Sequence, residues 1–341
     1  MASPKHLGGL RSCIARAAAL LVLMVLMSSV APHQADAAMD GGACVVIDTD
    51  FDIDDMMAIP VVIGNRHVAA IVTSEGVTPA EVAARALSRL IAEPEERAIP
   101  VIVGASSRRS DAEIRRKWSW LPYFRAAMSR TNDLLAAPLA PAPRSFHNFT
   151  EELARATADC RRVDLLITGT YTSFIRYSTK LAPKLGHVVV MGKPIGDPLL
   201  KPGQYSFNCG YDLPACRTAM VQLRGIRTSW VDVPRGTDPL YAPSLAMVEG
   251  LRPYGLTGSL KAALLANQHT WNPAKLHLSP DGFGESLMWD ESAALYLLHP
   301  ELFTPVGRHY EPRVIGGSHE RTRARLLRTW THDTNAATSY R

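Results

Sequence analysis

The residues most able to do chemistry in this sequence lie in one acidic segment near its start. Five aspartates occur within eight residues, at positions Asp48, Asp50, Asp52, Asp54 and Asp55. Like charges at this density repel one another unless protons or a cation neutralise some of them. Hard oxygen ligands in such numbers suit Ca²⁺ or Mg²⁺. The segment therefore predicts a metal site; the alternative is a solvated acidic turn, but such turns seldom lie between two apolar runs.

The apolar runs on either side indicate the elements that hold this segment. Cys44–Ile47 has the composition of a buried parallel strand. Met56–Val62 predicts the start of a helix with Asp54 or Asp55 near its N-cap. The aspartates would then lie on the loop at the carboxyl end of a strand, where open α/β sheets place their sites.

Strand and helix signals alternate from Cys44 to about residue 232. This alternation predicts an α/β fold with a mainly parallel central sheet flanked by helices on both faces, an open doubly wound arrangement. The final predicted helix covers Trp289–Leu298, and residues 309–330 predict a small C-terminal hairpin around Gly316 and Gly317. We expect residues 38–341 to form a single domain.

Residues 1–37 have the pattern of a signal peptide. Basic residues precede the apolar run Ala17–Met27, which is too short to span a membrane, and a small-x-small cleavage site ends at Ala37. We therefore expect an exported protein, periplasmic or secreted, without a membrane anchor after processing.

Export also bears on the cysteines of the mature chain, because an oxidising compartment permits disulfides. Cys44 and Cys160 both precede predicted strands and could meet at one end of the sheet, while Cys209 and Cys216 are close in sequence. Free buried thiols remain the alternative for both pairs.

The charge of the chain is modest and gives no sign of a nucleic-acid partner. Removal of the leader lowers the net charge from +5 to +3. The remaining basic residues are scattered, apart from an arginine group that alternates like the solvent face of a strand: Arg321, Arg323, Arg325 and Arg328. We expect a small-molecule ligand and no nucleic acid.

Two metal or phosphate motifs can be compared with the acidic segment. An EF-hand needs Gly at the sixth loop position and Glu at the twelfth, but counting from Asp48 these are Ile53 and Ile59. A haloacid-dehalogenase-type phosphatase would use Asp48 and Asp50 as its Asp-x-Asp pair, yet Asp52 replaces its usual Thr or Val. The EF-hand is excluded, and the phosphatase stays a minor alternative.

A third motif fits better. Asp48–Asp55 resembles the Asp-Thr-Asp-Pro-Gly-x-Asp-Asp motif of the inosine-uridine-type nucleoside hydrolase family. Further segments resemble other motifs of that family and follow in the family's order over residues 44–303: Gly169–Ser173, Met191-Gly192, Phe207-Asn208 and the helix beginning Trp289-Asp290.

The resemblance implies a Ca²⁺ site at the carboxyl edge of the sheet and cleavage of a nucleoside into free base and ribose. The metal ligands that it implies are Asp48, Asp55, the backbone carbonyl of Thr172 and Asp290. Asp48 would also act as the general base on a water held by Ca²⁺, and Asp54 and Asn208 would hold ribose hydroxyls. For Thr172, a helix N-cap is the alternative. An oxocarbenium-like sugar in the transition state requires such nearby negative charge and a positioned water.

The sequence also departs from the family. Phe51-Asp52 replaces Pro-Gly, Glu75 lies in a turn where many members have Asn, and Ser206 replaces a glutamate. Trp289 occupies the position of a histidine that protonates the leaving base in inosine-uridine-preferring members, and an indole N–H cannot act as a general acid at neutral pH.

Two interpretations follow from these departures. Purine-preferring members of the family use tryptophan stacking, and Trp289 could stack a purine with Trp118 or Trp120. Simple packing is the alternative for these rings. A periplasmic protein that keeps the Ca²⁺ site but only binds a nucleoside or sugar is the alternative to an enzyme. The resemblance also suggests a homo-oligomer, although no stretch of the sequence identifies an interface.

Overall fold

The computed structural model describes residues 43–92, 99–107, 109–133, 148–234, 241–267 and 288–337. All of them lie in one compact unit spanning Gly42–Arg341. The expected signal peptide and its cleavage site lie outside the described residues, so the domain boundary at residue 38 stays a prediction. Within the described ranges, no helix is both long enough and apolar enough to cross a membrane.

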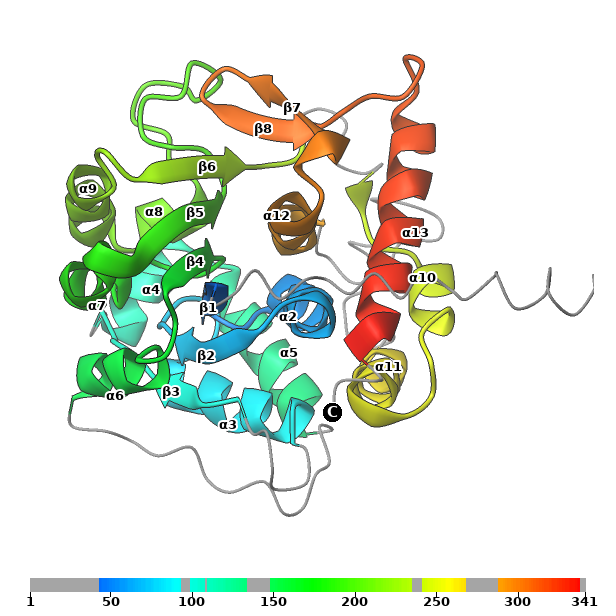
Figure 1. The fold of residues 1–341 in the computed structure, drawn as a ribbon, viewed down its shortest axis with the longest axis horizontal. Helices are drawn as coiled ribbons and strands as arrows, with labels where there is room; N and C mark the ends of the chain where they lie inside the picture. The colour runs from blue at the N-terminus through cyan, green and yellow to red at the C-terminus, as the bar shows by residue number, and fades with distance from the viewer. Residues whose placement is uncertain are drawn as a thin grey trace, which may run out of the picture. The chain divides into compact units, whose positions relative to one another are not determined.

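In the described part of the chain, eight strands form one sheet, which confirms the predicted α/β fold (Figure 1). Its order from one edge to the other is β3 (Val101–Val103), β2 (Val68–Thr73), β1 (Ala43–Thr49), β4 (Arg162–Ile167), β5 (Leu185–Met191), β6 (Arg227–Val231), β8 (His309–Pro312) and β7 (Phe303–Val306). The strands from β3 to β6 are parallel, β8 continues parallel to β6, and β7 is antiparallel to β8. The order reverses direction between β1 and β4, which is where doubly wound sheets bind ligands.

Successive side chains of β1 enter two separate hydrophobic cores. Val45 and Ile47 pack on one face of the sheet, and Cys44 and Val46 pack on the other. This period of two follows from the pleat of the strand, and burial on both faces explains the continuous apolar run.

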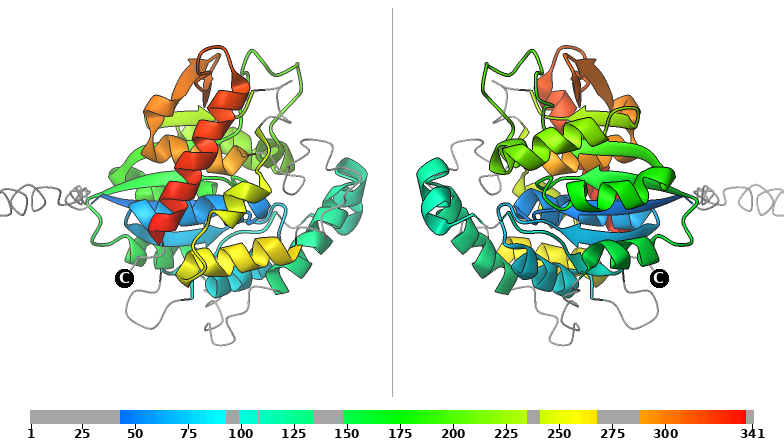
Figure 2. Two further views of the ribbon diagram at one scale, coloured as in Figure 1. Left: turned by 90° about the vertical axis from the view of Figure 1, so that its right-hand side faces the viewer. Right: turned by 90° about the vertical axis from the view of Figure 1, so that its left-hand side faces the viewer.

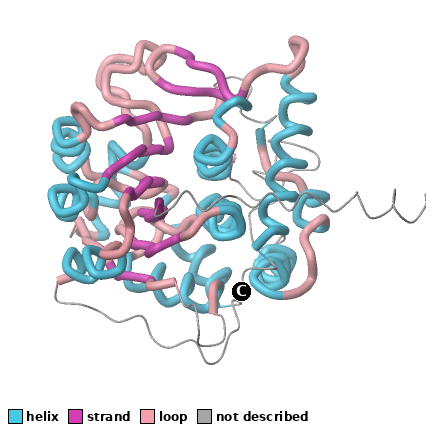
Figure 3. The backbone as a smooth tube through the Cα atoms, viewed as in Figure 1, coloured by secondary structure: helices cyan, strands magenta, loops and turns pink. Residues whose placement is uncertain are grey.

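Helices cover both faces of the sheet (Figures 1 and 3). The core on the first face includes side chains of α2 (Ile53–Asn65), α3 (Ala80–Leu90), α4 (Asp111–Lys117), α5 (Leu121–Asp133), α10 (Leu245–Glu249), α11 (Gly255–Asn267), α12 (Trp289–Leu298) and α13 (His319–Ala336). The core on the second face includes side chains of α6 (Phe149–Ala156), α7 (Phe174–Leu181) and α9 (Leu213–Gln222). The short α8 (Phe207–Tyr211) contributes to both cores, and η1 (Ala182–Lys184) and η3 (Pro300–Leu302) are single 3₁₀ turns.

The C-terminal hairpin exists, but its predicted position was wrong. It consists of β7 and β8, which are joined around Gly307, whereas residues 319–336 form the long helix α13 that packs against α2 (Figure 2). Ser318 caps α13, and its buried residues Thr322, Leu326 and Trp330 recur every fourth position. The alternating arginines suggested a strand. That interpretation left out the buried residues, whose spacing of four positions is typical of a helix.

Both cysteine pairs are disulfide-bonded. Cys44 and Cys160 join the start of β1 to the residue before β4, and Cys209 and Cys216 join α8 to α9. The second bond holds α8, which contributes Phe207 and Asn208 to the candidate site, against the helix that follows it.

Candidate active site

A cavity of about 480 Å³ lies at the carboxyl edge of the sheet. Its walls combine carboxylates, small polar groups and aromatic rings. The lining residues are Asp50, Asp52, Asp54, Val77, Trp120, Phe124, Met191, Gly192, Tyr205, Ser206, Phe207, Asn208, Asp232, Val233 and Trp289. This volume lies within the range of small-molecule sites.

Carboxylates from two distant segments meet beside this cavity. One carboxylate oxygen from each of Asp54, Asp55 and Asp290 lies within 4.8 Å of the others, and all three residues are buried. Asp54 and Asp55 lie in the first turn of α2, and Asp290 lies in the first turn of α12, which packs alongside α2 (Figure 1). Burial and the neighbouring carboxylates raise the pKa of Asp54 and Asp290 well above the ordinary range. Such a cluster is stabilised by a cation or by protons.

Carboxylate oxygens without hydrogen-bond partners, in this cluster and in the next residue of α12, agree with a metal site. Oδ1 of Asp290 and both side-chain oxygens of Glu291 are buried without a hydrogen-bond partner among the described residues. Buried carboxylates without partners are costly unless they are neutralised or coordinate a metal. Glu291 received no role from the sequence, although the resemblance covers the helix that contains it. The donors are all hard oxygens, so the residues fit a divalent cation such as Ca²⁺.

Asp48 does not line the cavity. The strand β1 extends to Thr49, two residues beyond its predicted end, so the pleat directs Asp48 toward the same face as Cys44 and Val46. There both of its carboxylate oxygens accept hydrogen bonds, at 2.5 Å from Ser74 Oγ and at 2.7 Å from Tyr177 Oη.

Asp50 lines the cavity instead. Its Oδ2 accepts a hydrogen bond of 2.7 Å from the Val77 amide. Burial and the adjacent Asp55 carboxylate raise the pKa of Asp50 well above its ordinary value. A Cβ at Gly76 would lie only 1.9 Å from Asp50 Oδ2, so this glycine permits the loop after β2 to enclose the carboxylate.

The two residues that replace the family's Pro-Gly have structural roles. Asp52 is the N-cap of α2: its side chain accepts from the Ile53 amide, and its own amide donates to Asp55 Oδ2 at 2.8 Å. The sequence predicted Asp54 or Asp55 near the N-cap, and this prediction was wrong. Phe51 is fully buried with a φ of 49°, a conformation that costs a bulky residue energy and that clusters at functional sites.

The expected sugar contacts lie around the same cavity. Asp54 and Asn208 both line it, and the Asn208 amide donates to the Thr168 carbonyl, which fixes the amide orientation. Ser206, which appeared in the sequence only as a lost glutamate, also lines the cavity, and its buried hydroxyl has no partner in the described part of the chain.

Thr172 is buried, and it is not among the residues that line the cavity. Its hydroxyl donates to Asp212 Oδ2 at 2.8 Å, and Ser173, rather than Thr172, is the N-cap of α7. The cap interpretation of Thr172 was therefore wrong, and the role of its carbonyl as a metal ligand stays a prediction.

The three candidate tryptophans separate into two groups. Trp120 and Trp289 line the cavity together with Phe124 and Phe207. Trp118 instead stacks on Tyr211, with ring centroids 5.1 Å apart, and Lys117 Nζ lies 4.5 Å from the Trp118 ring centroid. Trp118 is thus a packing residue. No histidine of the described ranges lines the cavity. His269 and His277, the histidines that the sequence offers as substitutes for the missing acid, lie outside the described residues.

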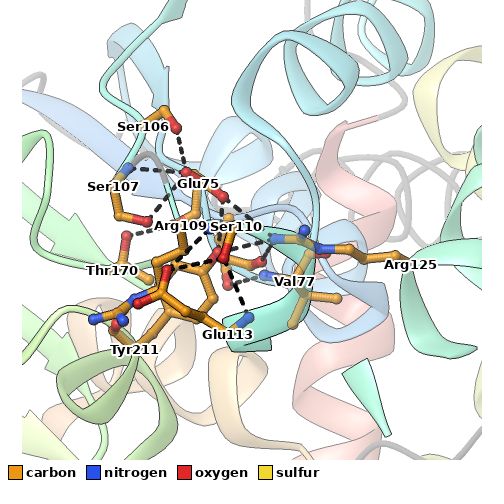
Figure 4. A network of polar contacts seen from close by, with 12 residues as sticks. Glu75, Val77, Ser106, Ser107, Arg109, Ser110, Glu113, Arg125, Thr170 and Tyr211 are labelled. Atoms are coloured by element: carbon orange, nitrogen blue, oxygen red, sulfur yellow. Dashed lines mark hydrogen bonds and ion pairs between the residues drawn. The ribbon is translucent and has the colours of Figure 1, made fainter. Parts of the chain in front are cut away.

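A polar network fixes the aromatic wall of the cavity (Figure 4). Glu75 accepts hydrogen bonds from the Ser107 amide at 2.9 Å and the Tyr211 hydroxyl at 2.8 Å, as well as from the Ser106 hydroxyl. Arg125, which follows Phe124 on α5, donates to the carbonyls of Gly76 and Val77 at 2.8 and 3.0 Å. The network therefore ties the loops after β2 and β3 to α5 and α8.

Glu75→Gln is expected to loosen this wall. Burial acts to raise the pKa of Glu75, but hydrogen bonds from Ser106 and Tyr211 and the charge of Arg125 outweigh it and hold this pKa below its ordinary value. A hydrogen bond to a charged group contributes about 1.5–3 kcal/mol, so we expect a loss of that order in unfolding free energy and a larger increase in KM than decrease in kcat. A lowered carboxyl pKa stabilises the fold above the pKa of the unfolded state. The difference from wild type should therefore shrink as pH falls through the folded-state pKa.

Urea unfolding at several pH values and steady-state kinetics measure both effects of Glu75→Gln. Glu81→Gln on the exposed surface of α3 is the matched control and should change neither. An unchanged KM together with unchanged stability would show that the network does not hold the wall.

Comparison with known proteins agrees with this geometry. Residues 45–339 match the family model described as inosine-uridine preferring nucleoside hydrolase, and the chain belongs to this family. It is a hydrolase that acts on N-glycosyl compounds, its substrate is a small-molecule nucleoside, and its family is metal-dependent. No curated protein matches the sequence.

Solved structures show the same fold at low sequence identity. The purine-preferring ribonucleoside hydrolase from Gardnerella vaginalis is 14% identical, with a TM-score of 0.57 over 86% of this chain and 99% of that one. The inosine-uridine preferring nucleoside hydrolase from Bacillus anthracis is 13% identical, with a TM-score of 0.54 over 86% and 99%. The type III effector protein XopQ, solved with adenosine diphosphate ribose, is 16% identical, with a TM-score of 0.55 over 87% and 92%.

Proposed function

We propose that this enzyme hydrolyses the N-glycosidic bond of a purine-type ribonucleoside with Ca²⁺ as its cofactor, releasing free base and ribose. The observation that carries the proposal is the composition of a single cavity, which combines clustered carboxylates with Trp120, Phe124 and Trp289. Carboxylates suit the sugar and its developing positive charge, and aromatic faces suit a base.

Asp54, Asp55 and Asp290 would hold the cation, with the unpaired Asp290 Oδ1 as one ligand atom. Asp50 is close enough to Asp55 for its pKa to respond to that carboxylate, and it would complete the ligand set. When bound, the cation supplies an electrophilic centre that orients a water and the sugar diol. Thr172 stays a predicted ligand through its carbonyl.

Asp50 is the better candidate for the general base than Asp48. Asp50 lines the cavity with one oxygen held by Val77, whereas both oxygens of Asp48 are occupied by Ser74 and Tyr177. In the proposed step, Asp50 takes a proton from the attacking water, and the water oxygen bonds to the anomeric carbon. The glycosidic electron pair leaves with the base nitrogen, which takes a proton from solvent water, and Asp50 then returns its proton to solvent.

The other cavity residues would bind the two halves of the substrate. Asp54, Asn208 and the unpartnered Ser206 hydroxyl offer hydrogen bonds to sugar hydroxyls. The rings of Trp120 and Trp289 would stack on the base, which favours the larger π-face of a purine.

A nucleoside panel tests the proposal. With Ca²⁺ present, we expect reducing-sugar release with higher kcat/KM for inosine, guanosine and adenosine than for uridine and cytidine. Base stacking contributes about 1–3 kcal/mol, so Trp120→Ala should lower the purine kcat/KM by about tenfold or more. Tyr254→Ala removes an exposed ring outside the cavity and serves as the matched control.

Two outcomes would contradict the proposal. Equal kcat/KM for purine and pyrimidine nucleosides would remove the purine preference. No release from any nucleoside, alongside measurable Ca²⁺ binding, would support the ligand-binding alternative.

Export of the protein is a separate proposal. Its support is the leader pattern of residues 1–37 together with the two disulfides, which persist in oxidising compartments.

A further inference from the structure

A second cavity, of about 400 Å³, lies at the opposite edge of the sheet from the candidate active site. The starts of β4, β5 and β6 and the ends of α2 and α12 form it, whereas the first cavity lies at the opposite ends of these elements. Its lining residues are Arg66, Arg162, Asp164, Gly186, His187, Arg227, Tyr296, Leu297 and Pro300.

Positive charge dominates this cavity. Among the residues that the structure describes, three arginines line it, and Asp164 is the one carboxylate that does so. The buried Asp164 pairs with Arg66 at 2.7 Å and with Arg162 at 3.4 Å. Asp164 also accepts a hydrogen bond from the His187 amide at 3.1 Å.

Among the described residues, no carboxylate forms an ion pair with Arg227, the third arginine of this cavity. Within the described ranges, its guanidinium has neither a hydrogen bond nor an ion pair, although it lines the cavity beside the Asp164 group. A guanidinium presents a planar fork of donors that matches phosphate and carboxylate oxygens.

His187 lines the same cavity, and its pKa responds to the surrounding arginines. Its Nε2 lies 2.9 Å from the Ser229 hydroxyl, which Tyr296 also contacts. Burial and then Arg227, with smaller effects of Arg162 and Arg66, lower the pKa of His187 to about 4, against the opposing effect of Asp164. The ring is therefore neutral at neutral pH, and it can donate or accept a hydrogen bond without adding charge.

We infer that this cavity is a second ligand site, which binds a small anion carrying a phosphate group through Arg227 and the adjoining arginines. Phosphate oxygens would take the free donors of Arg227, and Tyr296, Leu297 and Pro300 form an apolar wall for an attached organic group. Two effects oppose the binding of an anion: the charge of Asp164 and the partial negative charges at the ends of α2 and α12. Together they are smaller than the positive charge of three guanidinium groups.

Isothermal titration calorimetry of the mature, Ca²⁺-loaded protein tests this inference. The probes are inorganic phosphate, glucose 6-phosphate and uncharged glucose. We expect both phosphates to bind and glucose not to bind. Tighter binding of the sugar phosphate would assign the natural ligand to a phosphate ester, and equal binding would assign it to the free oxyanion.

Arg227→Gln should weaken phosphate binding by about tenfold or more, because a hydrogen bond to a charged group contributes about 1.5–3 kcal/mol. Arg217→Gln, on the exposed surface of α9, makes the same charge change elsewhere and should have no effect. Nucleoside hydrolysis should be unchanged in both variants, since neither residue lines the first cavity.

NMR titration of the His187 ring is the second measurement. A bound phosphate should raise the pKa of His187 in the wild type, and this increase should be reduced in Arg227→Gln. No binding of either phosphate, or binding that is equally strong in Arg227→Gln with no response of His187, would overturn the inference. Because these readouts are of binding alone, they stand apart from any failure of the proposed nucleoside hydrolysis.

Discussion

Asp50→Asn is expected to lower kcat for nucleoside hydrolysis by about 10²–10⁴-fold, the usual contribution of a positioned general base. Asparagine keeps the size of the side chain and can still accept the Val77 amide hydrogen bond, but it cannot take a proton from the attacking water. Because Asp50 also adjoins the carboxylate cluster, the same change should weaken Ca²⁺ binding. Kinetics at saturating Ca²⁺ separate the loss of the base from the loss of metal.

Asp48→Asn is the matched comparison two residues away. An amide nitrogen at this position cannot accept the hydrogen bond that Ser74 or Tyr177 donates, so a buried hydroxyl loses its acceptor. We expect a loss of about 1–3 kcal/mol in unfolding free energy, with a much smaller effect on kcat than in Asp50→Asn. The reverse result, an inactive Asp48→Asn and an active Asp50→Asn, would restore Asp48 as the base.

Removal of the divalent metal should abolish activity and destabilise the fold. A ligand that binds only the native state adds about 2.7 kcal/mol of stability at a free concentration 100-fold above its Kd. Asp290→Asn should weaken Ca²⁺ binding and reproduce part of this loss, because it removes a charge from the cluster around Asp54 and Asp55. Asp159→Asn, at an exposed position, is the matched control.

The pH dependence of the metal-free protein gives a sharper form of this test. Burial raises the pKa of Asp52 to about 7 and raises those of Asp54, Asp290 and Glu291. Such groups hold protons in the native state that the unfolded chain has already released, so stability falls as pH rises from about 4 toward 7.

Calorimetry with and without a chelator measures this effect. The increase in melting temperature on adding Ca²⁺ should be larger at pH 7 than at pH 5, since protons no longer neutralise the cluster at the higher pH. A chelator that changes neither activity nor melting temperature would exclude a catalytic divalent cation.

The position of the site could be predicted from local sequence, but its individual roles could not. The apolar runs around the acidic segment place it at the carboxyl end of a strand, and the structure confirms that location. The end of that strand was predicted two residues too early. In a strand, side chains alternate between faces, so this small error decides whether Asp48 points into the cavity or toward Tyr177.

In the helix after β8, local sequence predicted the wrong type of secondary structure. Arginines at alternating positions suggested a strand at residues 321–328, but buried Leu326 and Trp330 pack on the first face of the sheet. Trp330 also donates to the Met57 carbonyl of α2 at 2.9 Å. The pattern of exposed residues was misleading because burial against α2, a segment far away in the chain, determined the structure.

The sequence by itself determined the α/β class, the position of the acidic loop at the carboxyl end of a strand and the nucleoside hydrolase family, because these depend on local periodicity and on motifs in a fixed order. Only the tertiary structure decided which carboxylates meet. It brought Asp290 to Asp54 and Asp55 and directed Asp48 toward Tyr177. It also placed Trp120, but not Trp118, among the residues that line the cavity with Trp289. It also gathered the arginines of the second cavity from separate elements. The physical reason is the same in each case: side-chain direction and the packing of distant elements set these distances, and neither is encoded in residue spacing along the chain.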